Sequence, residues 1–267
     1  MTPSLSVVIP AYRSATTLSR VLEGLQQQPS DDFEVLVIDD GSPEEDSHEL
    51  FQATEEYRRR CPGRSIHYAF LGPVTNQFRA GLARNYGASF AKAPRVLFLD
   101  SDCVPGPTVV AGHTTYADQP VVVAGAHQQL PYISAGAGEF WRILSVTAPE
   151  PDPRLKCYAA IRRRTSASRA FDTHFWPAFW SCQVSVPRER FAALGGFWEA
   201  IDGYGSEDQE LAWRMQQAGC RLRIDFHLHV WHIGKPSRLS GGQARKRRDE
   251  IMARSQREPL KRPSQFL

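Results

Sequence analysis

Apolar runs and amphipathic stretches alternate along the first hundred residues. Short, almost continuously apolar runs are typical of buried strands, and apolar residues spaced three and four apart are typical of one helix face. The runs predict strands at 5–12, 33–40, 66–71 and 95–102. The periodic stretches predict helices around 18–25, at about 44–60 and at 79–93. Strands and helices that alternate in this way predict a parallel sheet with helices on its faces.

The pattern is less regular in the second half of the chain. It predicts a strand at 120–130, a short helix at 138–146, a mobile loop at 148–173, a strand and short helix within 179–197, and an edge strand at 220–234.

A further helix is predicted to start after Ser206 and to end at Gly219. Ser206 suits an N-cap, and Gln209 three residues later completes a capping box. The predicted buried face of this helix consists of Leu211, Ala212, Met215 and Ala218.

Composition narrows the class of protein. The chain has 267 residues, of which 42% are apolar and 23% charged, as in an ordinary soluble globular protein. Its five cysteines are odd in number and form no CxxC pair, which favours a reducing compartment over a disulfide framework or a cysteine zinc site. The N-terminus lacks the basic segment of a signal peptide, so we expect a cytoplasmic protein.

Charge is distributed unevenly. Residues 235–267 contain ten Lys/Arg and three Asp/Glu, a net of +7, and the remaining 22 basic and 26 acidic residues give a net of −4. The plainer interpretation is a solvated, partly disordered tail. The alternative is contact with an anionic partner or with the periphery of a membrane.

Two predicted strands end in paired carboxylates. Asp39 and Asp40 follow one apolar run, and Asp100 and Asp102 follow another. In parallel sheets ligands bind beyond the carboxyl ends of the strands, so these acids mark a candidate site. Acids so close together repel unless a metal ion, hydrogen-bond donors or water compensates them. A divalent cation that holds a diphosphate is the sharpest of these possibilities.

Other phosphate-binding patterns are absent from the sequence. No GxxxxGK[ST] occurs, and "SAGAGEF" lacks the third glycine of a dinucleotide fingerprint. No feature indicates a nucleic-acid partner.

The predicted helix after Ser206 carries Glu207 and Asp208 in its first turn. Stabilisation by the helix dipole, by roughly 0.3–1 kcal/mol each, would explain these acids without a catalytic role. The flexible turn from Gly203 to Gly205 favours the alternative, a general base that a ligand can approach closely. His232 would join a metal site only if the fold brought it to Asp102.

At this point the sequence resembles a known family. "SVVIPAY", "VLVIDDGS", "GLARNYG" and "LFLDSD" resemble the nucleotide-binding half of GT-A glycosyltransferases, specifically glycosyltransferase family 2. "GGFWEAIDGYGSEDQELAWRM" resembles the acceptor-side motif of galactosyltransferase-like domains. The resemblance covers roughly residues 4–234. It implies an α/β GT-A fold, Rossmann-like, with a mostly parallel central sheet. Residues 1–105 would be the nucleotide-binding half of the catalytic domain, 106–234 the acceptor-binding half, and 235–267 a basic tail.

The resemblance also implies roles for individual residues. Asp40 would bind the base, usually uracil, with Asp39 in support, and Asp208 would be the catalytic base, positioned by Glu207. The implied nucleotide-binding residues are Pro10, Ala11, Tyr12, Asp39, Asp40, Arg84, Asp100 and Ser101. The implied ligands of Mn²⁺ or Mg²⁺ are Asp102, His232 and Asp100. The implied activity is metal-dependent, inverting hexosyl transfer from a nucleotide-sugar, usually a UDP-sugar.

Two alternatives remain beside this interpretation. The chain could be a nucleotide-sugar-binding module without catalysis. A sugar-phosphate nucleotidyltransferase would need a glycine-rich basic loop after the first strand, which "IPAYRSATT" lacks. The acceptor stays open among a glycan, a lipid-linked sugar, a peptide and a metabolite.

Overall fold

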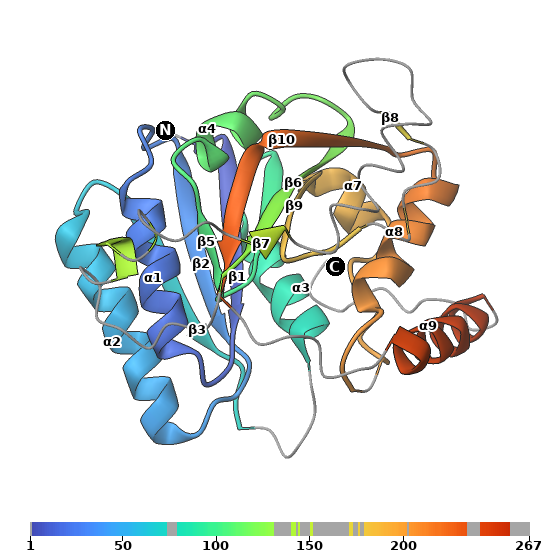
Figure 1. Cartoon of the computed structure of the whole chain (residues 1–267), viewed down its shortest axis with the longest axis horizontal. Helices are drawn as coiled ribbons and strands as arrows, with labels where there is room; N and C mark the ends of the chain where they lie inside the picture. Colours follow the sequence, from blue (N-terminus) through green and yellow to red (C-terminus); the bar gives the residue numbers. More distant parts are fainter. Residues whose placement is uncertain are drawn as a thin grey trace.

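The computed structural model describes residues 2–73, 79–130, 140–142, 144, 150–151, 171–172, 176, 179–201, 203–233 and 241–256. Within these residues the chain forms one twisted, mixed sheet with helices on both faces (Figure 1). No helix in the described part is both long and apolar enough to cross a membrane.

The sheet has the strand order β3-β2-β1-β4-β9-β6-β10-β5, and the short strands β7 and β8 pair with β6 and β10. The four N-terminal strands are parallel, as predicted: β1 (Leu5–Ala11), β2 (Phe33–Asp39), β3 (Ser65–Phe70) and β4 (Arg95–Leu99). The others are β5 (Cys103–Pro105), β6 (Val121–Gln129), β7 (Glu150–Pro151), β8 (Phe171–Asp172), β9 (Gln183–Pro187) and β10 (Arg221–His232). Strand β9 is antiparallel to β4 and β6, whereas β10 is parallel to β6, so the sheet becomes mixed beyond β4.

Side chains alternate between two cores on opposite faces of the sheet. On one face Leu5, Val7 and Ile9 of β1 pack with α1 (Ala15–Gln26) and α2 (Glu44–Arg60). On the other face Val8 packs with helices that include α3 (Ala80–Phe90), α7 (Arg188–Ala193) and α8 (Glu207–Gln217). Helix α4 (Val109–Thr114) follows β5. This two-sided burial explains why the parallel strands are continuously apolar.

The prediction of an edge strand at 220–234 is wrong. Strand β10 lies between β6 and β5, with a register shift between Asp225 and His229. Strand β5 has only three residues, too few to show alternation in the sequence, and it pairs with β10 at Val230–His232, while β8 pairs with Leu222 and Arg223 near the other end.

The start of α8 also differs from the prediction. Ser206 has left-handed backbone angles and makes no capping hydrogen bond with its side chain, so the predicted capping box does not form. Leu211, Ala212 and Met215 are buried as predicted, but Ala218 is exposed because the helix ends at Gln217.

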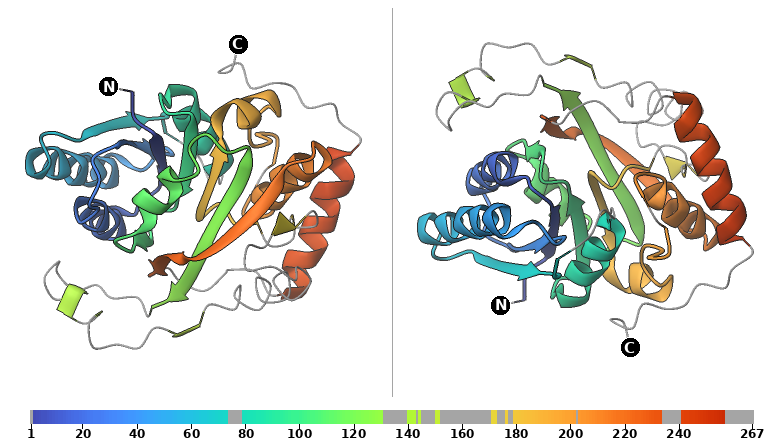
Figure 2. Two further views of the ribbon diagram at one scale, coloured as in Figure 1. Left: turned by 90° about the horizontal axis from the view of Figure 1, so that it is seen from above. Right: turned by 90° about the horizontal axis from the view of Figure 1, so that it is seen from below.

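Helix α9 (Gly241–Ser255) occupies part of the predicted tail and lies against α8 (Figure 2). Ile251 and Met252 are buried there. Residues 241–255 therefore form an ordered helix that packs along one face, and most of the other described side chains of this helix are exposed. Of the loop predicted at 148–173, only the short strands β7 and β8 lie within the described residues.

Candidate active site

The ends of β1 and β2 form the first part of the site. The Asp40 amide donates to the carbonyl oxygen of Ala11 over 2.8 Å, which joins the two strand ends. Pro10 and Ala11 are buried in β1, whereas Tyr12 after the strand is 48% exposed. The predicted nucleotide-binding residues at this end thus combine a rigid backbone with an accessible ring.

Asp39 and Asp40 are both buried, and protein donors hold both. Asp39 accepts hydrogen bonds from the Ser42 amide at 2.8 Å and the Tyr68 hydroxyl at 2.7 Å. Asp40 accepts from the amide and Nε of Arg79, at 3.0 and 3.1 Å. Burial raises the pKa of Asp40 to about 6, although Arg79 opposes the shift. Arg79 is a partner that the sequence analysis did not identify.

Arg84 connects the end of β4 to the start of α8. Its Nη2 donates to Asp100 over 2.7 Å and its Nη1 to Glu207 over 3.2 Å. Burial alone would lower the pKa of Arg84, but the two carboxylates raise it above its ordinary value. The sequence predicted Arg84 as a nucleotide-binding residue, and its hydrogen bonds within the described part of the chain go to these two acids. Ser101, also predicted to bind the nucleotide, is half-buried next to Asp100 in the chain.

The fold brings His232 to Asp102. The amide of Ile233 donates to the Asp102 carbonyl oxygen over 2.9 Å, and His232 pairs with Cys103 across β10 and β5. As a result, His232 Nε2 lies 3.5 Å from Asp102 Oδ2. The sequence analysis required that the fold bring His232 to Asp102, and the structure does so.

Gln129 orients the His232 ring. Its amide nitrogen donates to the carbonyl oxygens of Leu130 and His232, at 3.0 and 3.1 Å, so its Oε1 is the atom left to accept. Oε1 lies 2.8 Å from His232 Nδ1, which must carry the proton. In the neutral ring the lone pair of Nε2 then faces Asp102, which is the tautomer that a metal ligand requires.

These residues fit a small divalent cation. Two atoms that each lie about 2.1 Å from one ion can be up to about 4.2 Å apart, and the 3.5 Å between His232 Nε2 and Asp102 Oδ2 is within that limit. A carboxylate and an imidazole suit Mn²⁺. Asp102, Cys103 and His232 offer ligand atoms within 4.8 Å of one another, so a thiol that the sequence analysis did not single out also lies beside the pair.

Helix α8 contributes Glu207 and Asp208, which lie in its first turn, to the candidate site. The turn that leads into it has positive φ at Gly203, Gly205 and Ser206, which sets the first helical turn at a sharp angle to the preceding chain. Asp208 Oδ1 accepts the Gln209 amide at 2.8 Å. Burial and the neighbouring Glu207 raise the pKa of Asp208 well above its usual range. A carboxylate with a raised pKa suits a general base near neutral pH.

The pKa of the Tyr204 hydroxyl depends on two pairs of acids, Glu207 with Asp208 and Asp100 with Asp102. Its ring is 45% exposed, and burial of its hydroxyl is the largest cause of its raised pKa. Negative charge from four carboxylates adds to that shift: Glu207, Asp100, Asp208 and Asp102. The predicted base and the predicted metal-binding acids therefore both act on the pKa of Tyr204.

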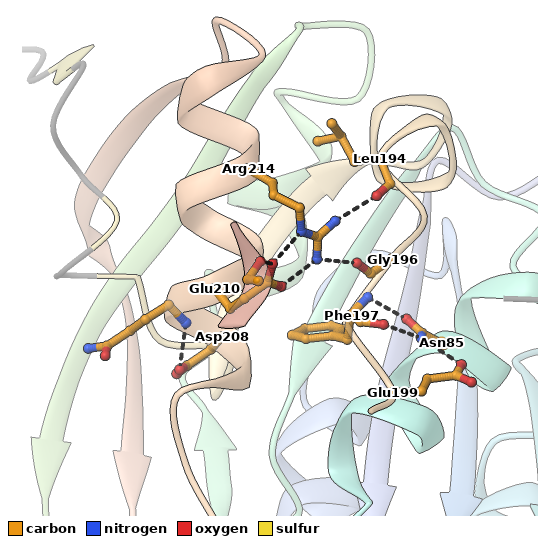
Figure 3. A network of polar contacts seen from close by, with 10 residues as sticks. Asn85, Leu194, Gly196, Phe197, Glu199, Asp208, Glu210 and Arg214 are labelled. Atoms are coloured by element: carbon orange, nitrogen blue, oxygen red, sulfur yellow. Dashed lines mark hydrogen bonds and ion pairs between the residues drawn. The ribbon is translucent and has the colours of Figure 1, made fainter. Parts of the chain in front are cut away.

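A polar network fixes α8 to the loop that precedes it (Figure 3). Arg214 is paired with Glu210 at 2.7 Å and donates to the carbonyl oxygens of Leu194 and Gly196, at 2.6 and 2.7 Å. Asn85 of α3 exchanges hydrogen bonds with the backbone of Phe197, at 2.8 and 2.7 Å. The helix that carries Asp208 is therefore anchored on a rigid part of the fold.

Comparison with known proteins identifies the family of the chain. The model of "Glycosyl transferase family 2" matches residues 6–176, and that of "N-terminal domain of galactosyltransferase" matches residues 162–235. A validoxylamine A glucosyltransferase from Streptomyces hygroscopicus subsp. jinggangensis is 32% identical over 88% of this chain and 56% of its own length. A chondroitin synthase from Pasteurella multocida is 26% identical over 88% of this chain and 25% of its own length. The chain thus spans about half the length of the validoxylamine A glucosyltransferases.

Solved structures share the fold at low sequence identity. The mannosyltransferase PcManGT from Pyrobaculum calidifontis, in complex with GDP-Man and Mn²⁺, has a TM-score of 0.64 at 19% identity, and the match covers 100% of this chain and 67% of that one. TarS residues 1–349 from S. aureus, in complex with UDP-GlcNAc, has a TM-score of 0.63 at 16% identity, with 94% and 66% covered. The family model, the relatives and the fold agree: the chain belongs to glycosyl transferase family 2 and has the GT-A fold.

Proposed function

We propose that the chain catalyses metal-dependent, inverting transfer of a sugar from a UDP-sugar to an acceptor hydroxyl. The observation that carries this proposal is Arg84, which ties Asp100 of the predicted donor site to Glu207, next to the predicted base. A donor bound at the strand ends and an acceptor near Asp208 would then meet in fixed geometry, which is how enzymes convert binding into rate.

Donor recognition is assigned to the ends of β1, β2 and β4. Asp40 is proposed to accept the N–H of uracil, supported by Asp39, while Tyr12 and the backbone of Pro10 and Ala11 border the base. Asp100 and Ser101 are proposed to face the ribose and diphosphate. Support comes from the burial of Asp39 and Asp40, because a fixed carboxylate discriminates better than a mobile one.

Asp102 and His232, with Asp100 beside them, are proposed to hold Mn²⁺ or Mg²⁺. When bound, the ion would neutralise charge on the departing diphosphate. The orientation of His232 by Gln129 supports the assignment, because a histidine with the other tautomer would present an N–H to the ion.

Asp208 is proposed to take the proton of the acceptor hydroxyl. The acceptor oxygen forms a bond to the anomeric carbon, the bond from that carbon to the diphosphate oxygen breaks, and the nucleoside diphosphate leaves with the electron pair. A single displacement with one base on the acceptor side inverts the anomeric configuration. The raised pKa of Asp208 supports this role.

The Streptomyces relative is named as a validoxylamine A glucosyltransferase, so UDP-glucose and a small polyhydroxylated acceptor are the first probes. Because another relative is named as a chondroitin synthase, a glycan is the second acceptor to be tested. The test is a thermal-shift screen of UDP-glucose, UDP-GlcNAc and GDP-mannose with and without Mn²⁺, because a ligand of the folded state raises its apparent stability. Donors that stabilise the protein are then tested for release of free nucleotide with validoxylamine A or chondroitin oligosaccharides.

A Mn²⁺-dependent shift with a UDP-sugar, followed by nucleotide release, is the expected result. A shift without release in the presence of every acceptor would favour a binding module without catalysis. No shift with any donor would contradict the proposal.

A further inference from the structure

Helix α9 reaches the turn that leads into the predicted base. Arg247 Nε donates to the carbonyl oxygen of Gly205 over 3.2 Å. Its guanidinium also lies against Gly203, where a Cβ atom would come within 3.3 Å of Nη2. Both glycines have positive φ, so the turn presents backbone rather than side chains to the arginine.

The same side of α9 makes further contacts with the acceptor half. Residues 247, 251 and 255 are spaced by four and so share one helix face. Ile251 is buried, and Ser255 Oγ donates to Glu210 of α8, which is fully buried. Arg254 adds a contact at a neighbouring position, with its guanidinium carbon 5.0 Å from the ring centroid of Trp198.

The turn at 203–206 needs such external support. Ser206 has a φ of 78°, which an L-residue other than glycine adopts at a cost, and its side chain makes no cap hydrogen bond. Conformations of this kind persist only where the surrounding structure fixes them. Glu207 and Asp208 come directly after the turn, so the backbone of the turn helps to set the position of the first residues of α8.

We propose that α9 is a clamp on this turn and that Arg247 is a positioning residue for Asp208. The inference rests on the proposed function, in which Asp208 acts on the acceptor. Arg247 holds Gly205 and Ser255 holds Glu210 of α8, so that the catalytic carboxylate stays aimed at the donor site. The basic segment then takes part in catalysis indirectly, through the geometry of the turn.

The test compares Arg247→Ala with Arg245→Ala. Arg245 is exposed and lies two positions away, on a different face of the same helix. Replacing it with alanine removes the same charge as replacing Arg247, but leaves the contact with the turn in place. We measure UDP affinity in the presence of Mn²⁺ by calorimetry, and kcat for UDP release from the donor that the thermal-shift screen identifies. Arg247→Ala should lower kcat about tenfold or more, a change of about 1.4 kcal/mol in barrier, and leave UDP affinity within about twofold of wild type. Arg245→Ala should change neither quantity.

Hydrogen–deuterium exchange gives a readout that needs no activity. Amides of 203–208 should exchange faster in Arg247→Ala than in wild type or Arg245→Ala. Arg247→Lys, which keeps a donor for the Gly205 carbonyl, should restore part of both kcat and protection. If Arg247→Ala fails to fold, the comparison uses Arg247→Lys and Arg247→Gln.

The outcomes separate the clamp from the proposed function. An active wild type with equal kcat and equal exchange in the two alanine variants would overturn the clamp. A loss of UDP affinity that matches the loss of kcat would also overturn it, because it would place Arg247 at the donor. A wild type without activity toward any donor would contradict the proposed function, and exchange at 203–208 would still decide whether α9 holds the turn.

Discussion

Replacing Arg84 with methionine isolates the ion pairs that join the two halves of the site. Arg84 is 3% exposed and contacts Asp100 and Glu207. Methionine fills a similar volume without charge or hydrogen bonds, so the fold should lose the ion pairs but little packing. The variant removes the guanidinium partner of two acids. The Glu207 side chain is 11% exposed and the Asp100 side chain is 31% exposed.

The loss of stability in the variant is set by Glu207, which can either stay ionised without its partner or take up a proton, whichever costs less free energy. Breaking a buried ion pair costs about 3–5 kcal/mol when the remaining charge stays ionised. Alternatively the acid takes up a proton, which at pH 7 costs about 3.7 kcal/mol for a glutamate with the pKa of about 4.3 that it has in water. The Asp100 side chain is more exposed than that of Glu207, so partial screening by water should make its contribution the smaller of the two. We therefore expect Arg84→Met to lower the free energy of unfolding by about 3–4 kcal/mol at pH 7.

The cost of protonation makes the loss depend on pH. At pH 5.3 protonating the same glutamate costs about 1.4 kcal/mol, so the difference between variant and wild type should shrink to about 1–2 kcal/mol. Urea denaturation at the two pH values measures both differences, and thermal melting at pH 7 should show a fall in Tm of about 10 °C.

Arg59→Met is the matched control. Its pair with Glu56 is between side chains that are 72% and 42% exposed, and such pairs contribute about 0–1 kcal/mol. The reasoning is refuted if Arg84→Met costs no more than Arg59→Met, or if its cost is the same at both pH values.

The remaining predictions concern the metal, the base and pH. Asp102→Asn should abolish Mn²⁺-dependent UDP binding in calorimetry while the circular dichroism spectrum stays unchanged; undiminished affinity with metal present would remove Asp102 from the ligand set. Asp208→Asn should lower kcat by about 10²–10⁴-fold with little change in donor affinity, and a variant with wild-type kcat would show that another residue is the base. Since the base must be ionised, the raised pKa of Asp208 should move the acidic limb of the kcat profile above the usual carboxyl range, and activity that stays constant down to pH 4.5 would contradict it. Donor affinity should rise with pH through about 6 as Asp40 loses its proton, and Asp40→Asn should flatten that profile; an inflection that survives in the variant belongs to another group.

Local patterns in the sequence determined the first half of the fold. The apolar runs of β2 and β4 end at Asp39 and just before Asp100, at the same edge of the sheet as the end of β1, because parallel strands have their carboxyl ends at one edge. Helix α2 runs over Glu44–Arg60, as its periodicity predicted. Periodicity is reliable where each element is long enough to repeat its pattern.

Only the tertiary structure decided how the second half completes the site. Strand β5 is too short to carry a pattern, yet it pairs with β10 and brings His232 to Asp102. Gln129 and Arg247 contact their partners from 103 and 42 residues away in the chain, and nothing in the local sequence indicates such contacts. The capping box does not form because Ser206 has left-handed backbone angles, which the local sequence pattern does not indicate. The sequence by itself determined which acids end the strands and which helix carries Glu207 and Asp208, because these depend on local periodicity. The approach of His232 to Asp102, the bridge through Arg84 and the docking of α9 depend on contacts between distant segments, which exist only once the chain has folded.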